Sequence, residues 1–127
     1  MTLNVPVKKD KANQQPIPNI WRSTLSLIVE AIKSNDYSLV NVDTSIKPIS
    51  LSDATRIQEN IEDYGCEVLS LRDETWITSV CQWMGGYWDV LIDLYTVEEG
   101  RSDLALSVRV YEHGSEFEFE VMSVHVE

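Results

Sequence analysis

Residues 86–106, GYWDVLIDLYTVEEGRSDLAL, decide the fold, because apolar and polar side chains alternate on both sides of a short acidic turn. One face of each segment is apolar: Trp88, Val90, Ile92 and Leu94 in the first, and Leu104, Leu106, Val108 and Val110 in the second. A side-chain period of two is typical of a strand with one buried face. Between the segments, Gly100 can adopt the left-handed backbone that a short hairpin needs. The sequence therefore predicts a β-hairpin with one face in the core.

Two helices are predicted upstream of this hairpin. The first covers residues 19–33, with Asn19 as its N-cap and apolar side chains at helical spacing. The second begins after Ser50 or Ser52, either of which can cap it, and ends at Gly65, a natural C-terminal cap residue. Both helices have one apolar face, which predicts that they pack against a sheet.

Further strands are predicted at residues 66–71, 76–83 and 116–126, where the apolar period is two. In the last of these, the apolar residues change parity along the strand. A β-bulge near residues 121–122 would place six of them on one face: Phe117, Phe119, Val121, Met122, Val124 and Val126. The order of elements predicts an α+β fold, with two N-terminal helices packed on one face of an antiparallel β-meander of four to five strands.

The predicted domain organisation is simple. Residues 1–16 are rich in Lys and Gln and are expected to form a flexible N-terminal tail, part of which docks through Val5 and Val7. Residues 17–127 are expected to form a single α+β domain. The N-terminus lacks the features of a secretory signal, and no apolar run is long enough to cross a membrane. A cytoplasmic location is therefore expected.

The charge of the chain is strongly negative and uneven. The 21 acidic and 10 basic residues give a formal net charge of −11. Residues 57–127 hold 16 carboxylates against three arginines, which is −13, whereas residues 1–56 carry five acids and seven bases, which is +2. Such a field repels nucleic acids and anionic membranes and attracts basic proteins. We expect a protein partner of basic charge, although high acidity also occurs simply because it keeps proteins soluble.

No catalytic motif is present. The two histidines lack metal-ligand spacing, and Cys66 and Cys81 are expected to be buried free thiols. We therefore predict no enzyme, no catalytic residues, no metal and no cofactor. The alternative is a metal-dependent hydrolase that uses Asp89, Asp93 and Asp103 of the hairpin. Asp89 and Asp93 lie roughly 13 Å apart along one strand, too far to hold one ion without a third carboxylate.

Residues 88–104, WDVLIDLYTVEEGRSDL, resemble the WDVxxDLxTxEEGRSDL core of a small bacterial α+β domain family of unknown function. The chain ends in SVHV before the last residue, similar to the final strand of that family. In size, acidity and layout the chain also resembles immunity proteins of contact-dependent growth inhibition toxin systems. That resemblance implies a cytoplasmic immunity protein that binds and neutralises a basic toxin domain, such as a nuclease, by protein–protein interaction.

The residues predicted to contact this partner are acids, together with tyrosines on the same faces, since tyrosine beside carboxylate suits an interface with Lys or Arg. They are Glu59, Glu62, Asp63, Asp73, Glu74, Tyr87, Asp89, Asp93, Tyr95, Glu98 and Glu99. The chain is expected to be a monomer or a weak homodimer. A further alternative is a non-enzymatic scaffold or oligomerisation module that self-associates through the edge strand at residues 117–126.

Overall fold

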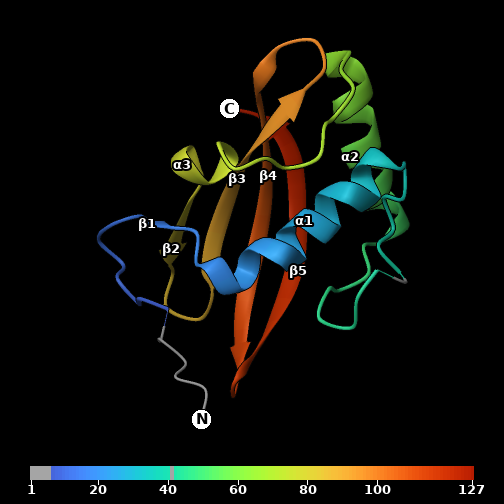
Figure 1. Cartoon of the computed structure of the whole chain (residues 1–127). Helices are drawn as coiled ribbons and strands as arrows, with labels where there is room; N and C mark the ends of the chain where they lie inside the picture. Colours follow the sequence, from blue (N-terminus) through green and yellow to red (C-terminus); the bar gives the residue numbers. More distant parts are fainter. Residues whose placement is uncertain (1–6, 41) are drawn as a thin grey trace.

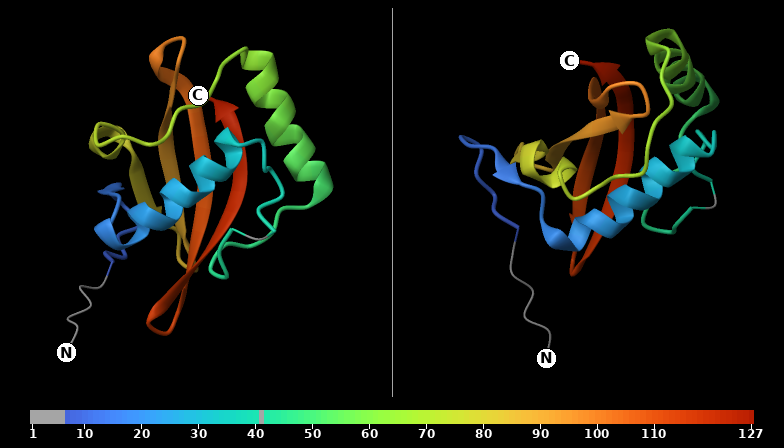
Figure 2. Two further views of the ribbon diagram at one scale, coloured as in Figure 1. Left: turned by 45° about the vertical axis from the view of Figure 1, so that its right-hand side comes forward. Right: turned by 45° about the horizontal axis from the view of Figure 1, so that its top comes forward.

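The computed structural model describes residues 7–40 and 42–127. In chain order its elements are β1 (Gln15–Pro16), α1 (Asn19–Lys33), α2 (Leu51–Tyr64), α3 (Thr75–Thr78), β2 (Val80–Trp83), β3 (Trp88–Thr96), β4 (Gly100–His113) and β5 (Glu116–Val126). The strands form one antiparallel sheet in the order β1-β2-β3-β4-β5. α1 crosses one face of the sheet and α2 runs beside β5 (Figures 1 and 2). The predicted α+β fold is confirmed, with five strands in the meander.

The two long helices have the predicted lengths, and their ends follow local rules. Asn19 is the first helical residue of α1 and not its cap, because Pro18 takes the N-cap position without a side-chain hydrogen bond. At the start of α2 the backbone N–H of Asp53 donates to the Ser50 hydroxyl over 3.2 Å, so Ser50 is the cap. Gly65 ends α2 with a left-handed φ of 75°.

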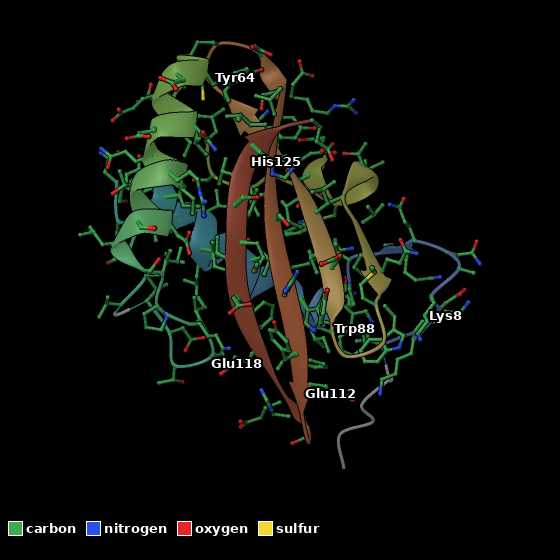
Figure 3. All side chains as sticks on the ribbon, turned by 180° about the vertical axis from the view of Figure 1, so that it is seen from behind. Lys8, Tyr64, Trp88, Glu112, Glu118 and His125 are labelled. Carbon is green, nitrogen blue, oxygen red and sulfur yellow. The ribbon has the colours of Figure 1, made fainter. Side chains whose placement is uncertain are left out.

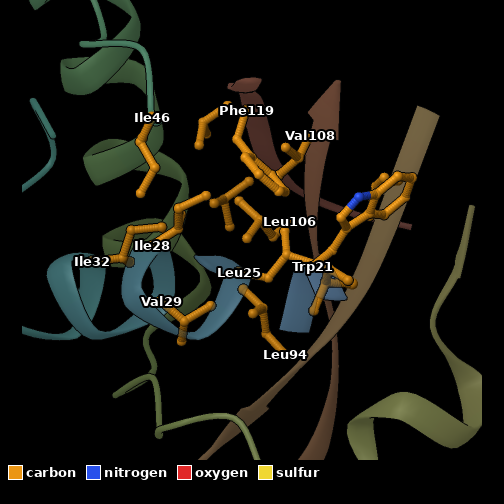
Figure 4. Close-up of a cluster of buried hydrophobic side chains, with 14 of the residues drawn as sticks. Trp21, Leu25, Ile28, Val29, Ile32, Ile46, Leu94, Leu106, Val108 and Phe119 are labelled. Atoms are coloured by element: carbon orange, nitrogen blue, oxygen red, sulfur yellow. The ribbon is translucent and has the colours of Figure 1, made fainter. Parts of the chain in front are cut away.

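The core lies between α1 and the inner faces of β3, β4 and β5 (Figure 4). Trp21 is its centre: the ring is fully buried and lies 5.3 Å from Trp88, 5.5 Å from Phe117 and 6.4 Å from Phe119, each in an edge-to-face arrangement. Edge-to-face contacts add to the free energy gained from burying these rings. The alternation predicted for the hairpin is confirmed, because the apolar side chains at every second position of β3 and β4 are buried.

The strand predicted at residues 66–71 is wrong. This segment makes only an isolated bridge, Val68 to Thr96, beside the end of β3. Two backbone hydrogen bonds hold it there, from the Leu69 N–H to the Tyr95 carbonyl and from the Val97 N–H to the Glu67 carbonyl. The segment crosses from α2 to α3 and contacts β3 too briefly to form a ladder.

The strand predicted at residues 76–83 is half wrong. Its second half is β2, but Thr75–Thr78 form the short helix α3. The N–H groups of Trp76 and Ile77 bond back three residues, to the carbonyls of Asp73 and Glu74, each over 3.2 Å. The β-propensity of Trp, Ile and Thr is a weak preference, and this local turn overrides it.

The predicted bulge in the last strand is confirmed. Ser107 pairs with Ser123 while the next residue, Val108, pairs with Val121, which leaves Met122 as the extra residue. Five of the six apolar residues therefore share one face. Met122 itself is the exception, because it lines a depression on the opposite face beside His125.

Part of the segment predicted as a tail lies against the sheet. Gln15 and Pro16 pair with Cys81 and Val80 of β2, and Val7 packs against the core. The predicted docking of Val5 falls on residues 1–6, outside the described residues. The boundary between a tail and a domain at residues 16 and 17 stays a prediction.

Candidate functional site

The last turn of α2 meets the β3–β4 turn at one end of the molecule, the upper end in Figure 1. Tyr64 joins them: its hydroxyl donates to the Glu99 carboxylate over 2.9 Å and accepts from the Asp103 N–H over 3.2 Å. The Glu67 N–H donates to the Glu98 carboxylate over 2.7 Å. We call this region the acidic end and define it by seven carboxylates: Glu59, Glu62, Asp63, Glu67, Glu98, Glu99 and Asp103.

The carboxylates of the acidic end lack cationic partners. Within residues 7–40 and 42–127, none of the seven forms an ion pair with a lysine or arginine, whereas six of the other fourteen acids do. Those other pairs include Lys9 with Glu112, Lys47 with Glu118 and Glu120, Arg72 with Glu74, and Arg109 with Asp89. In this described part of the chain, the seven carboxylates therefore lack close ion-pair partners, and the one arginine beside them in the sequence, Arg101 of β4, is not paired with any of them.

The electrostatic potential of the acidic end acts on neighbouring groups. Burial raises the pKa of the Cys66 thiol, and the charges of Glu98 and Glu99 raise it further. At Tyr64, the hydrogen bond from the Asp103 amide favours the phenolate, but burial and the Glu99 and Asp103 carboxylates outweigh it, so the pKa of Tyr64 is raised. Both groups resist taking on negative charge, as expected in a field of that sign.

The structure brings together five of the eleven predicted contact residues. These are Glu59, Glu62 and Asp63 on α2 and Glu98 and Glu99 in the β3–β4 turn. The other six lie elsewhere: Asp73 and Glu74 just before α3, and Tyr87, Asp89, Asp93 and Tyr95 on or beside the sheet face that α1 and α2 leave uncovered.

Figure 3 shows the uncovered sheet face. On this face, an arginine of the chain itself packs over the ring of each of the two predicted contact tyrosines. The Arg109 guanidinium lies 4.5 Å from the centre of the Tyr87 ring, and its Nε is 3.9 Å from Asp89. The Arg72 guanidinium lies 5.0 Å from the centre of the Tyr95 ring. These side chains stabilise one another and are less available to a basic partner than the acidic end is.

The carboxylates proposed for a hydrolase are not assembled. Asp89 faces Arg109, and Asp93 accepts a hydrogen bond from the Thr78 hydroxyl. Asp103 lies at the acidic end beside Tyr64. In the part of the chain that the structure describes, no three His, Cys, Asp or Glu side chains are close enough together to hold a metal ion.

Two carboxylates of the acidic end, Glu67 and Asp103, were not among the predicted contacts, and neither was Tyr64, which joins its two elements. The Tyr64 hydroxyl contacts residues that are 35 and 39 positions away in the sequence. Long-range contacts of this kind leave no trace in local periodicity. The sequence feature that could have indicated the acidic end is an acidic turn directly after a strand, together with acids in the last turn of a helix.

The fold and this surface define a small α+β domain with a helical layer on one face of its sheet and an unpaired acidic end. The chain belongs to the family described as Domain of unknown function (DUF7668), which matches residues 29–127, from within α1 to the last residue. The predicted membership of an uncharacterised small domain family is thus confirmed; the family match shows no link to immunity proteins. No curated protein and no solved structure matches the chain. No helix of the described residues is both long enough and apolar enough to cross a membrane.

Proposed function

We propose that this chain is a non-catalytic binding protein that presents its acidic end to a basic protein. The observation that supports this is the set of seven carboxylates at one end without ion-pair partners in the described residues. A concentrated surface field attracts a partner of opposite charge and speeds its association. Contacts with lysine or arginine would also relieve the repulsion among the carboxylates.

The position of the acids supports a role in binding, because it is unfavourable for the isolated fold. Glu62 and Asp63 lie in the last turn of α2, where the helix dipole is negative, and no basic residue occupies that turn. Glu59 and Asp63 are four residues apart, so their side chains repel on one helix face. Charges that weaken a fold are typical of functional surfaces.

The specific form that we propose is an immunity protein of the cytoplasm, whose partner is a cationic toxin domain such as a nuclease. Binding would neutralise the toxin by covering the cationic surface with which it grips a polyanionic substrate. This form rests on the resemblance in size, acidity and α+β layout.

The proposal is preferred to self-association through the β5 edge, because other parts of the chain cover that edge. Lys47 donates its N–H to the Phe119 carbonyl over 2.9 Å, and the Phe119 N–H donates to Ser45 over 2.8 Å. Further along, the Asn60 side chain donates to the Val124 carbonyl over 2.9 Å. These three hydrogen bonds occupy two positions of the edge, at Phe119 and Val124, and so oppose pairing with another strand there.

The test compares two variants with the same change in net charge. The first removes acids of the acidic end (Glu59→Gln, Asp63→Asn, Glu67→Gln), and the second removes acids of β5 (Glu116→Gln, Glu118→Gln, Glu120→Gln). Where a secreted protein with a cationic C-terminal domain is encoded beside the gene, that domain serves as the binding partner in this test. We expect the first variant to associate about tenfold more slowly at about 20 mM NaCl and the second to stay within about twofold of the unmodified chain. Stopped-flow fluorescence at low and moderate salt measures both rates.

Two outcomes would contradict the proposal. Equal slowing in both variants would mean that total charge, and not the acidic end, determines binding. The proposed immunity function is wrong if the chain forms no complex with such a cationic toxin domain and does not restore growth of cells that express the toxin domain. Lysozyme serves as an unrelated basic protein, and a specific partner must bind far more tightly than lysozyme does.

A further inference from the structure

Residues 8–16, which we call the strap, lie beside β2 at the edge of the sheet, and the strap begins near Trp88, away from the acidic end (Figure 3). The body of the domain holds the strap mainly through its backbone. The Trp88 indole N–H donates to the Lys8 carbonyl over 3.1 Å, and the Gln82 side chain donates to the Lys11 carbonyl over 2.7 Å. At its end, the strap forms β1 and pairs with β2.

One strap side chain makes a specific contact with the body. The Lys9 ammonium lies 2.9 Å from the Glu112 carboxylate, 5.1 Å from the centre of the Trp83 ring and 5.9 Å from that of Trp88. Trp83 and Trp88 are themselves packed, with ring centres 4.6 Å apart. A carboxylate combined with two indole rings is a favourable site for a cation. Together, these groups form a recognition surface for a segment with one well-placed lysine: Trp83, Trp88, Gln82 and Glu112.

The strap itself buries little apolar surface. Its residues 8, 9 and 11–14 are exposed, and three of these are lysines, facing a body of opposite charge. Segments with few buried apolar contacts open at low cost in free energy, well below that of global unfolding. The strap bends at residues 11–13, where the Asp10 carboxylate accepts from the Ala12 N–H and the Asn13 side chain. Backbone hydrogen bonds and the Lys9 anchor hold it against the sheet edge and two indole rings, as a bound peptide would be held.

We propose that the surface formed by Gln82, Trp83, Trp88 and Glu112 is a docking site for a basic peptide, and that the strap is its intramolecular occupant. A basic segment of a partner binds there only when it displaces residues 8–16. The tether at Ile17, which is buried, keeps the strap at a high local concentration, in the millimolar range for a short link. Competing peptides therefore bind weakly until the strap is loosened.

The test uses a labelled synthetic peptide of residues 7–18 as the probe and the full chain as the receptor. Lys9→Glu removes the ion pair and both ring contacts, and so loosens the strap. Lys8→Glu is the matched control, with the same charge change one residue away, because in the described residues Lys8 contributes only its backbone carbonyl to strap binding. We expect the peptide to bind Lys9→Glu at least about fivefold more tightly than the unmodified chain or Lys8→Glu, measured by fluorescence anisotropy.

A scrambled peptide of the same composition should bind none of the three proteins with comparable affinity. Adding Trp83→Ala to Lys9→Glu should abolish peptide binding, with circular dichroism confirming the fold. Equal affinity for all three proteins, or equal binding of the scrambled peptide, would overturn the proposal. Hydrogen exchange of the unmodified chain gives a second test that needs no variant. If the amides of the strap are as protected as those of the β3–β4 ladder, the strap does not open separately and the proposal fails.

This inference does not depend on the acidic end. The probe is a segment of the chain itself, and its docking surface lies at the other end of the sheet. The peptide experiment can therefore show displacement of the strap even if the chain has no toxin partner. Conversely, a toxin can bind the acidic end even if the strap never opens.

Discussion

Trp21 and Trp88 are both fully buried with their rings 5.3 Å apart, yet only one of their indole N–H groups is paired. Trp88 donates to the Lys8 carbonyl, whereas the Trp21 N–H has no acceptor within the described residues. An unpaired buried donor costs about 1–3 kcal/mol, which the edge-to-face packing of Trp21 must offset. Packing alone therefore holds Trp21, while Trp88 links the core to the strap.

Cys81 provides a prediction for alkaline pH. Burial raises the pKa of its thiol from 9.0 to about 11. Below about pH 9 the thiol is protonated in both the folded and unfolded chain, so folding is unaffected. Between about pH 9 and 11 the unfolded chain loses this proton and the folded chain keeps it, so the free energy of unfolding falls, by on the order of 2 kcal/mol.

Urea unfolding under reducing conditions from pH 7 to 11 measures this loss, and Cys81→Ala is the control. The difference in unfolding free energy between the two proteins should be constant below about pH 9 and should shrink above it. A constant difference up to pH 11 would show that the Cys81 thiol ionises normally.

At the scale of secondary-structure elements, the hairpin that organises the sheet depends on the glycine that follows its turn. Gly100 has a φ of 71°, a left-handed value that costs other residues free energy. Gly86, in the β2–β3 turn, does not have a positive φ, and an added Cβ would meet nothing within 4 Å. We expect Gly100→Ala to lower the unfolding free energy by about 1 kcal/mol and Gly86→Ala to be near neutral, in urea titrations. Equal effects would mean that the conformation of Gly100 is not what the hairpin requires.

At the scale of the whole molecule, the acidic end should make stability depend on salt. With a net charge of −11 and carboxylates gathered at one end, repulsion destabilises the fold at low ionic strength. The variant Glu59→Gln, Asp63→Asn, Glu67→Gln should raise the Tm by about 2–4 °C at about 20 mM NaCl. The gain should largely vanish at about 0.5 M NaCl, where the repulsion is screened.

The β5 variant provides the contrast in the same calorimetric scans. Glu118 and Glu120 pair with Lys47, and Glu120 also accepts from the Tyr111 hydroxyl over 3.0 Å, so their removal loses favourable contacts. We expect no rise in Tm for Glu116→Gln, Glu118→Gln, Glu120→Gln at low salt. A rise equal to that of the acidic-end variant would show that total charge alone sets the stability.

Local patterns were sufficient where a residue's place depends on its neighbours in sequence. The alternation of Trp88, Val90 and Ile92, the cap at Ser50 and the stop at Gly65 all have structures that short-range rules predict. The bulge at Met122 was also predictable, because the parity of apolar residues changes there. Residues 75–78 were mispredicted because β-propensity is weaker than the turn in which they lie.

The sequence by itself determined the fold class, the meander and the excess of negative charge. Only the tertiary structure decided which carboxylates meet, because Tyr64 joins α2 to the β3–β4 turn across 35 residues and Arg109 pairs with Asp89 across two strands. It also decided that residues 8–16 lie over Trp83 and Trp88. The physical reason is that charge and hydrogen bonding act between groups close in space, and periodicity along the chain carries no information about such distances.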